Sequence, residues 1–479
     1  MKLRLPFLAA AMSVCLTSCG LTQPEPVRDE ERRAGAKQHP ILLAELGGAY
    51  RGDEAGYVTA LGARLAAKAG LADRCTFTLV NSDVVNAFAV PGCYIYVTRG
   101  LLAIVNSEAE LASVLAHEVG HIAADHGERQ EKRALWRSLG VAAIATITGS
   151  DALTRLAGQA AGLFTLRYSR QHEYEADALS VRYLRDAGYD PYAAVGMLGA
   201  LGRNEAYQKS VRGVDDARSI PEWARTHPLT ERRLERAAEG AGALGVQRDE
   251  LPENVLGYLR SVDGLLYGDD PEQGFIVGRQ FAHPVMRIGF EAPPGFTLSN
   301  SPQQILIEGP DGLRGSFSGG PVPSGGLPAY AGVALERTLG SAPVTIVSTR
   351  QGATNGGRAL YLAGLIATSR GEVPISMAVY EAPDGGAYHF LVVSRPDSTV
   401  LAAVPQLFSS FHFLTQDELT GLRPRRIKVV LARPGQTVSD LAAVSAGAAT
   451  PEMLLMLNGL SGRGALGSAQ PVKSVVWSR

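Results

Sequence analysis

Residues 114–126 read VLAHEVGHIAADH and contain three histidines and a glutamate. His117 and His121 are four positions apart, which places them one turn apart on the same face of an α-helix. Both imidazoles can therefore bind one ion, with Glu118 beside them. In this HExxH spacing the two histidines bind Zn²⁺ and the glutamate acts as the general base of a metalloprotease. We therefore expect His117 and His121 to be zinc ligands and Glu118 to be the catalytic base.

The sequence around the motif favours a helix over residues 107–126. Ser107 and Glu110 form a capping-box pattern at its start, and an apolar stripe follows. A buried helix that is merely rich in histidine is the alternative interpretation. His126 is nine residues after His117 and so lies on roughly the opposite face. We expect His126 to support a ligand or lie at the surface, not to bind the metal.

A second predicted helix, residues 167–191, offers a third ligand. Catalytic zinc usually has three protein ligands and keeps one position for water. Glu173 and Asp177 are four apart and share a face, whereas Glu175 points away. We expect Glu173 to bind the metal and Asp177 to orient a ligand histidine from behind. His172 and Glu175 are expected to be solvated.

The N-terminus has the features of a lipoprotein signal. A short basic start precedes an apolar stretch, residues 5–16, that is too short to span a bilayer. LTSCG at 16–20 resembles a bacterial lipobox, so we expect a signal peptide over 1–18 and lipidation of Cys19. An ordinary cleaved signal peptide is the alternative. Gly20 after the cysteine favours the outer membrane over the inner, facing the periplasm.

The two cysteines beyond the signal, Cys75 and Cys93, are expected to form a disulfide, because the compartment is oxidising. Each precedes a predicted strand, at 76–82 and 94–99, and a third strand, 86–90, lies between them. If 86–90 runs antiparallel to 94–99, the two strands led by cysteines lie parallel, with the cysteines at matching ends. Two reduced cysteines or a second metal site are the alternatives.

Four ordered motifs carry a family resemblance over about residues 40–245. They are NAFAVPG (86–92), HEVGH (117–121), EYEADALS…AGYDP (173–191) and THPLTERRL (226–234). These resemble metallopeptidase family forty-eight, which includes CAAX prenyl proteases, HtpX-type proteases and the periplasmic BepA-like branch. The lack of transmembrane patterns makes the chain most similar to that last branch. Cys93 stands where we expect a second glycine of the family motif.

The resemblance implies a zincin-type domain that holds one zinc on His117, His121 and Glu173, with Glu118 as base. It also implies that His227 and Arg233 lie near the metal. His227 would act in catalysis as an oxyanion donor or as a gating ligand, and the alternative is a helix-start residue beside Pro228. Separately, we expect an edge strand that pairs with an extended substrate, made of Asn86, Ala87, Phe88 and Ala89.

We expect an α+β protein of several domains. The predicted order is a tether (19–45), a mainly helical metalloprotease domain with a small sheet (46–250), a linker (251–283), an α+β domain similar to the Mog-like or PsbP-like fold (284–416), and a βααβ domain (426–479). The last resembles a LysM module. Ala469 replaces its usual glycine, so peptidoglycan binding and protein docking both stay open. The apolar segment 136–165 is expected to pack in the core, with a lid or membrane contact as alternatives.

The sequence therefore predicts a lipid-anchored zinc endopeptidase that acts on unfolded or misassembled envelope proteins. The net charge is −1, and the absence of a basic stripe argues against nucleic acid as a partner. The rival hypothesis is an envelope chaperone or a peptidoglycan-bound adaptor with minor proteolysis. An intact set of metal ligands with its base favours the enzyme.

Overall fold

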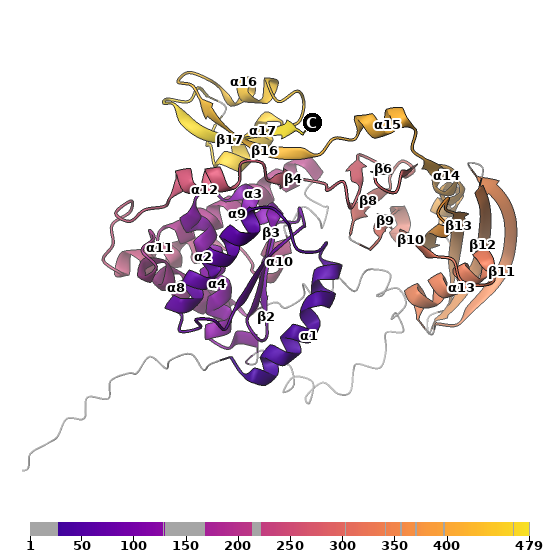
Figure 1. Cartoon of the computed structure of the whole chain (residues 1–479), viewed down its shortest axis with the longest axis horizontal. Coiled ribbons are helices and arrows are strands. Elements are labelled where there is room, and N and C mark those ends of the chain that lie inside the picture. The colour runs from indigo at the N-terminus through magenta and orange to yellow at the C-terminus, as the bar shows by residue number, and fades with distance from the viewer. Residues whose placement is uncertain are drawn as a thin grey trace, which may run out of the picture.

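The first half of the chain combines a group of helices with a small sheet (Figure 1). The computed structural model describes residues 27–127, 129, 168–212, 222–301, 303–340, 342–354, 357–368, 371–395, 398–462 and 464–478. The helices here are α1 (Asp29–Glu45), α2 (Glu54–Lys68), α3 (Arg99–Ile104), α4 (Glu108–Ala123), α8 (Arg170–Asp186), α9 (Ala193–Arg212), α10 (Glu222–Thr226), α11 (Glu231–Ala243) and α12 (Val255–Ser261). The strands are β1 (Thr76–Val80), β2 (Ala87–Val90) and β3 (Tyr94–Thr98), in the order β1-β3-β2.

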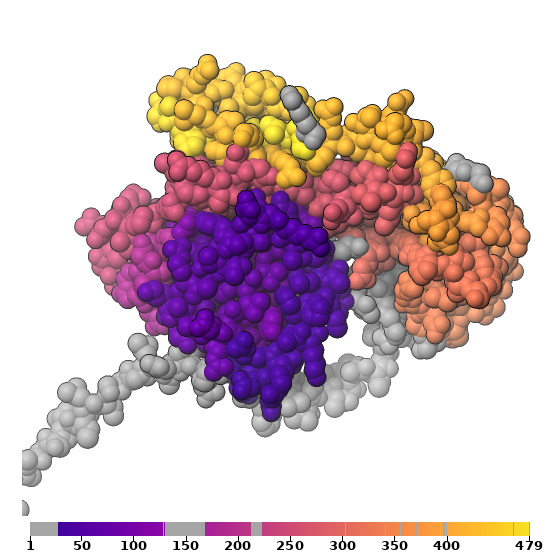
Figure 2. All heavy atoms as spheres, viewed as in Figure 1, coloured from indigo at the N-terminus to yellow at the C-terminus, as the bar shows by residue number. Residues whose placement is uncertain are grey.

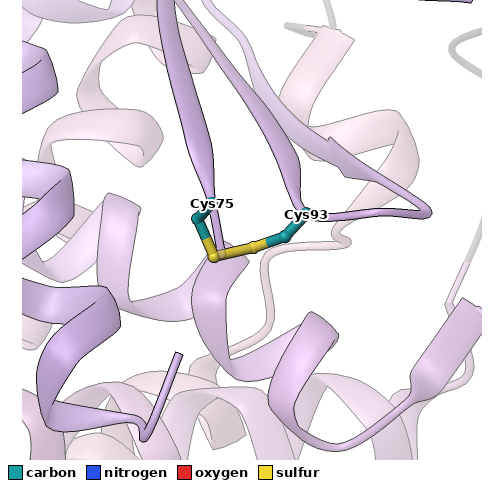
Figure 3. Close-up of a disulfide and its surroundings, with 2 residues drawn as sticks. All are labelled: Cys75 and Cys93. Atoms are coloured by element: carbon teal, nitrogen blue, oxygen red, sulfur yellow. A yellow bond between two sulfur atoms is a disulfide. The ribbon is translucent and has the colours of Figure 1, made fainter. Parts of the chain in front are cut away.

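The small sheet confirms the predicted strand pairing. β1 and β3 run parallel, with Thr76 opposite Tyr94, and β2 runs antiparallel to β3 at the edge of the sheet. Cys75 and Cys93 precede the two parallel strands and form the predicted disulfide, with a Cα–Cα distance of 4.6 Å (Figure 3). The bridge therefore fixes the start of β3 beside the start of β1.

The helix that carries the HExxH motif is almost wholly buried. At its start, Ser107 Oγ accepts a hydrogen bond from the Glu110 amide (3.0 Å), as predicted. The Glu110 carboxylate accepts from the Asn106 amide, so only half of the capping box forms. α4 packs against α8, and a Cβ at Gly120 would lie 3.3 Å from the Ala176 carbonyl oxygen. Glycine at position 120 thus lets α8 approach the metal-binding face.

Two predicted boundaries differ from the structure. The tether ends earlier than residue 45, because Asp29–Glu45 form α1, whose Leu42 is buried against the small sheet. The segment 251–283 is not a linker: it contains α12 and several strands. Tyr258 of α12 is fully buried, and its hydroxyl donates to the Leu102 carbonyl. Tertiary packing, which local composition does not report, orders both segments.

The second domain is built on a seven-stranded antiparallel sheet in the order β11-β12-β13-β14-β10-β9-β8. Helix α13 covers one face, and a four-stranded sheet, β15-β7-β6-β5, and α14 lie on the other. The elements are β5 (Phe275–Val277), β6 (Gln280–His283), β7 (Ile288–Glu291), β8 (Thr297–Asn300), β9 (Ile305–Glu308), η2 (Pro310–Gly312), β10 (Arg314–Pro321), α13 (Gly326–Leu339), β11 (Val344–Thr354), β12 (Gly357–Thr368), β13 (Gly371–Glu381), β14 (Gly386–Val393), η3 (Thr399–Ala403), α14 (Val404–Ser409), β15 (His412–Phe413) and α15 (Gln416–Gly421).

The C-terminal module has the predicted βααβ order: β16 (Arg425–Ala432), α16 (Val438–Ala443), α17 (Pro451–Asn458) and β17 (Gln470–Trp477). It shares one hydrophobic core with the first half of the chain, and β16 pairs with β4 (Leu266–Tyr267). Lys473 is fully buried and donates to the carbonyls of Ala103 and Val105 at the end of α3, at 2.7 Å each. In the space-filling view the module (yellow) rests directly on the segment that contains α12 (Figure 2).

The membrane-related predictions concern residues that the structure leaves undescribed. Cys19 and the apolar segment 136–165 both lie outside the described residues. Among the helices that are described, none combines the length and the apolar character needed to cross a bilayer.

We predict that replacing both disulfide cysteines (Cys75→Ser with Cys93→Ser) lowers the free energy of unfolding by about 3 kcal/mol. The bridge spans 18 residues, and loop closure in the unfolded chain sets this magnitude. Denaturant unfolding under oxidising conditions gives the value, and wild-type protein in reductant should match the variant. Free thiols at both positions in the oxidised mature protein would contradict the bridge.

Candidate active site

Four buried side chains from three parts of the chain meet at one point. His117 and His121 come from α4 and Glu173 from α8, as predicted, and His227 follows α10. One nitrogen or oxygen from each of the four lies within 4.8 Å of the others. All four residues are 1% exposed. The cluster therefore has the residue types and the burial of a zinc site.

The distances within the cluster fit a tetrahedral ion. Zinc bonds of about 2.0–2.1 Å place neighbouring ligand atoms roughly 3.3 Å apart. The two histidine Nε2 atoms are 3.0 Å apart, and each lies 3.6 Å from a Glu173 carboxylate oxygen. His227 Nδ1 lies 3.4 Å from His117 Nε2. The residues present thus fit zinc, with His227 at the fourth position.

Glu118 is placed as the base of such a site. It is fully buried, and neither of its carboxylate oxygens has a hydrogen-bond partner among the described residues. Oε1 lies 3.7 Å from His227 Nε2. Burial raises the pKa of the Glu118 carboxyl, although nearby His227 and His117 oppose this shift. A buried carboxylate without a partner is costly to the fold and points to a functional role.

An ion pair supports His117 from behind. Asp177 Oδ1 lies 3.0 Å from His117 Nδ1, and the Arg233 guanidinium donates to both oxygens of Asp177 at 2.7 Å. Burial would raise the pKa of Asp177, but Arg233 holds it below its ordinary value. This is the carboxylate–histidine arrangement that orients metal ligands. The structure therefore brings together Asp177 and Arg233 as the sequence predicted.

His126 supports the second ligand histidine. α4 ends at Ala123, and Asp125 adopts a left-handed φ of 52°, which turns the chain back toward the cluster. His126 Nδ1 comes to lie 2.9 Å from His121 Nδ1. With zinc on His121 Nε2, its Nδ1 would carry the proton and donate to His126. His126 is buried and therefore does not lie at the surface. Its contact with His121 agrees with the other expectation, that it supports a ligand.

The prediction that His172 is solvated is wrong, and that for Glu175 holds only in part. His172 is 1% exposed and stacks on the His126 ring, with centroids 4.4 Å apart. The Glu175 side chain is 40% exposed, but its Oε2 lies 3.3 Å from His126 Nε2 and 3.0 Å from Arg129. The turn after α4 brings these groups together, and helical spacing alone does not show that contact.

Two aromatic residues near the cluster were missed from the sequence. Trp223 is fully buried, stacks on His227 with centroids 4.9 Å apart, and has an indole N–H without a partner among the described residues. Tyr168 stacks on His121 at 3.8 Å. Tyr168 lies just before α8, and Trp223 lies in α10 ahead of His227. These positions near the ends of helices were the only sign in the sequence that the two residues could reach the cluster.

The predicted substrate strand lies at the edge of the small sheet, against α4. Ala87, Phe88 and Ala89 belong to β2, and Asn86 precedes it. Asn86 is 1% exposed, and neither polar atom of its side chain amide has a partner in the described part of the chain. Buried polar groups without a partner among the described residues thus occur at the start of this strand (Asn86) and at the cluster (Glu118 and Trp223).

We predict that Glu173→Ala lowers zinc occupancy, whereas Glu175→Ala leaves it near one ion per chain. Only Glu173 reaches the two ligand histidines, and a partly exposed carboxylate can be replaced by water. Metal analysis of the purified proteins measures both. Full occupancy in the first variant with loss in the second would show that the helix face is wrongly assigned.

We predict that His126→Leu weakens zinc binding by roughly 10- to 100-fold, the usual effect of losing a partner of a ligand histidine. His126→Asn should bind more tightly than His126→Leu, because its amide oxygen can still accept from His121 Nδ1. Chelator competition measures the affinity, and thermal unfolding of the metal-free proteins controls for folding. Equal zinc affinities for the two variants would contradict a hydrogen-bonding role.

Comparison with known proteins gives the same family that the motifs suggest. Residues 53–241 match the model described as Peptidase family M48. The beta-barrel assembly-enhancing protease of Yersinia pestis is 31% identical over 198 residues, which are 39% of this chain and 39% of that protein. The mitochondrial metalloendopeptidase OMA1 of Arabidopsis thaliana is 33% identical over 162 residues, 34% of this chain and 30% of that one.

The chain thus spans well under half of the length of these curated relatives. Among solved structures, a cyanobacterial PsbP from Synechocystis is similar with a TM-score of 0.24 and 13% identity, over 29% of this chain and 98% of that chain. The family match covers α2 through most of α11, which includes every residue of the ligand cluster. Residues 53–241, which hold the whole ligand cluster, are therefore similar to the domain described as Peptidase family M48.

Proposed function

We propose that this chain is a zinc-dependent endopeptidase that hydrolyses peptide bonds of unfolded or misassembled proteins in the cell envelope. The observation that carries the proposal is the buried, unpaired Glu118 carboxylate beside the cluster of His117, His121 and Glu173. A buried site that serves only to hold a metal does not need a free base. The similarity to metalloendopeptidases supports the same activity.

The residues of the site have complementary tasks. A bound zinc ion would polarise the scissile carbonyl and make water a stronger nucleophile. Glu118 would accept a proton from that water and then donate it to the leaving amine. Burial raises the pKa of the Glu118 carboxyl, and a higher pKa strengthens its carboxylate as a proton acceptor. Asp177 and Arg233 would hold His117 in place during these steps.

His227 fits a gating ligand better than an oxyanion donor. Its Nδ1 lies 2.9 Å from Glu173 Oε1 and within the ligand cluster, where water would otherwise complete the site. Its Nε2 faces Glu118 at 3.7 Å. An oxyanion donor would instead stand apart from the ligands, facing the carbonyl of the substrate. We therefore assign His227 to control access of water and substrate.

The edge strand supports an extended substrate. β2 pairs only with β3 within the described residues and lies against α4, so a peptide can add to its free edge. Extended backbone is available in unfolded or misassembled chains and not in folded ones. The resemblance of residues 16–20 to a lipobox and the name of the Yersinia relative, which refers to β-barrel assembly, support action in the envelope.

The rival function, a chaperone or a peptidoglycan-bound adaptor, rests on the C-terminal module. Its sequence resembles a LysM module, and its elements follow the order β-α-α-β. However, Lys473 and the shared core join this module to the peptidase domain. We propose that the module stabilises the enzyme and that glycan binding is an additional property. A pull-down of the protein with peptidoglycan tests this binding.

We predict that Glu118→Gln keeps its zinc but loses cleavage of an unfolded casein-like substrate by roughly 100- to 10,000-fold, the usual effect of removing a general base. Glu235→Gln, an exposed glutamate on α11, serves as the matched control and should retain full activity. Metal analysis and a fluorescent casein assay give the two readouts. Near-normal cleavage by Glu118→Gln would overturn the proposed mechanism.

A further inference from the structure

The second domain contains a cavity of about 540 Å³ that the peptidase chemistry does not use. It lies between β6 and β7 of the four-stranded sheet and the end of the seven-stranded sheet where β10, β14 and the β8–β9 turn meet. Its volume is in the range of ligand-binding pockets. Gln273 lines it and donates to the Asn81 carbonyl at the end of β1 (3.0 Å), so the cavity adjoins the peptidase domain.

The floor of the cavity is aromatic. Phe281 and Phe317 are each 3% exposed, and the half-buried Tyr388 ring stacks on Phe317 with centroids 6.0 Å apart. A Cβ at Gly319 would lie 2.8 Å from the Tyr388 ring, so a side chain there would crowd that ring. Glycine at position 319 keeps this surface accessible. The floor therefore suits one large apolar side chain.

One wall of the cavity is an unpaired strand edge. All eight residues of β10 pair with β14, but β9 pairs only with Arg314–Phe317. Within the described part of the chain, residues 318–321 have no second strand neighbour, and all four line the cavity. An open strand edge can pair with the backbone of an added strand. The wall thus provides the contacts that an extended peptide requires.

The rim is negatively charged. Glu272 and Asp384 are exposed at the opening, and none of the described residues that line the cavity is Lys or Arg. His283, also in the lining, is 5% exposed, and burial lowers its pKa, so it adds no positive charge near neutral pH. The rim therefore complements a cationic ligand.

We propose that this cavity binds an extended peptide segment that carries a large apolar side chain next to a Lys or Arg. Neighbouring side chains of a strand point in opposite directions. An apolar residue can thus enter between Phe281, Phe317 and Tyr388 while adjacent cations face Glu272 and Asp384. The backbone would pair with residues 318–321. On the proposed function, the cavity holds part of an unfolded substrate outside the zinc site.

Direct binding to the full chain tests the proposal. Glu118→Gln protein, which cannot cleave, is titrated into a fluorescein-labelled heptapeptide of alternating lysine and phenylalanine, and anisotropy is measured. Glu272→Lys with Asp384→Lys, added to this protein, should weaken binding roughly three- to tenfold at low salt, the range for two exposed ion pairs. Glu372→Lys, an exposed charge on β13 outside the cavity, should not. A peptide with glutamate in place of lysine should bind more weakly.

The binding site is located with the same peptide carrying a benzophenone at its central position. We expect crosslinks to residues 303–305, 318–321 or Phe281. Three results would each overturn the proposal. One is crosslinking confined to β2, and another is equal binding by the charge-reversal and control variants. The third is displacement of a bound apolar dye by lipid but not by the peptide. Casein cleavage by wild-type enzyme is scored separately. Cleavage without peptide binding overturns only this inference, and peptide binding without cleavage overturns only the peptidase assignment.

Discussion

The ion pair between Asp177 on α8 and Arg233 on α11 fixes the geometry on which the zinc site depends. Both side chains are almost fully buried, and the guanidinium reaches both carboxylate oxygens at 2.7 Å. Losing one partner of a buried pair typically costs about 3–5 kcal/mol, because the other charge remains unpaired. The pair keeps Asp177 beside His117 Nδ1, and Arg233 also lies 3.1 Å from Glu173. Three helices are thereby held together at the position of the metal.

The C-terminal module extends this arrangement to the whole chain. Lys473 places a buried amino group against carbonyls at the end of α3, and its burial lowers the pKa of this group to about 7. The next helix, α4, begins four residues after Ile104 and carries the HExxH motif. The module therefore packs beside the start of the metal-binding helix and is not a tail on a flexible linker.

Local patterns predicted the site better than the domain boundaries. His117, His121, Glu173 and Asp177 followed from helical spacing, and the parallel strands with their disulfide followed from where Cys75 and Cys93 stand. Periodicity relates residues within one element, which is why these side chains lie where the spacing placed them. The burial of α1 and α12 and the docking of the C-terminal module depend on contacts between segments that are far apart in the chain. The contact of His126 with His121 depends on the left-handed backbone of Asp125. No local pattern reports such contacts, so the tether and the linker were wrongly assigned.

Anomalous X-ray diffraction at the zinc absorption edge, on crystals of the purified full chain, tests the central claim most directly. We expect a single peak per chain, about 2.0–2.1 Å from His117 Nε2, His121 Nε2 and a Glu173 oxygen. His227 Nδ1 or a water should occupy the fourth position, and Asp177 should remain on His117 Nδ1. A peak elsewhere, or one that lacks Glu173 among its ligands, would contradict a zinc site on His117, His121 and Glu173.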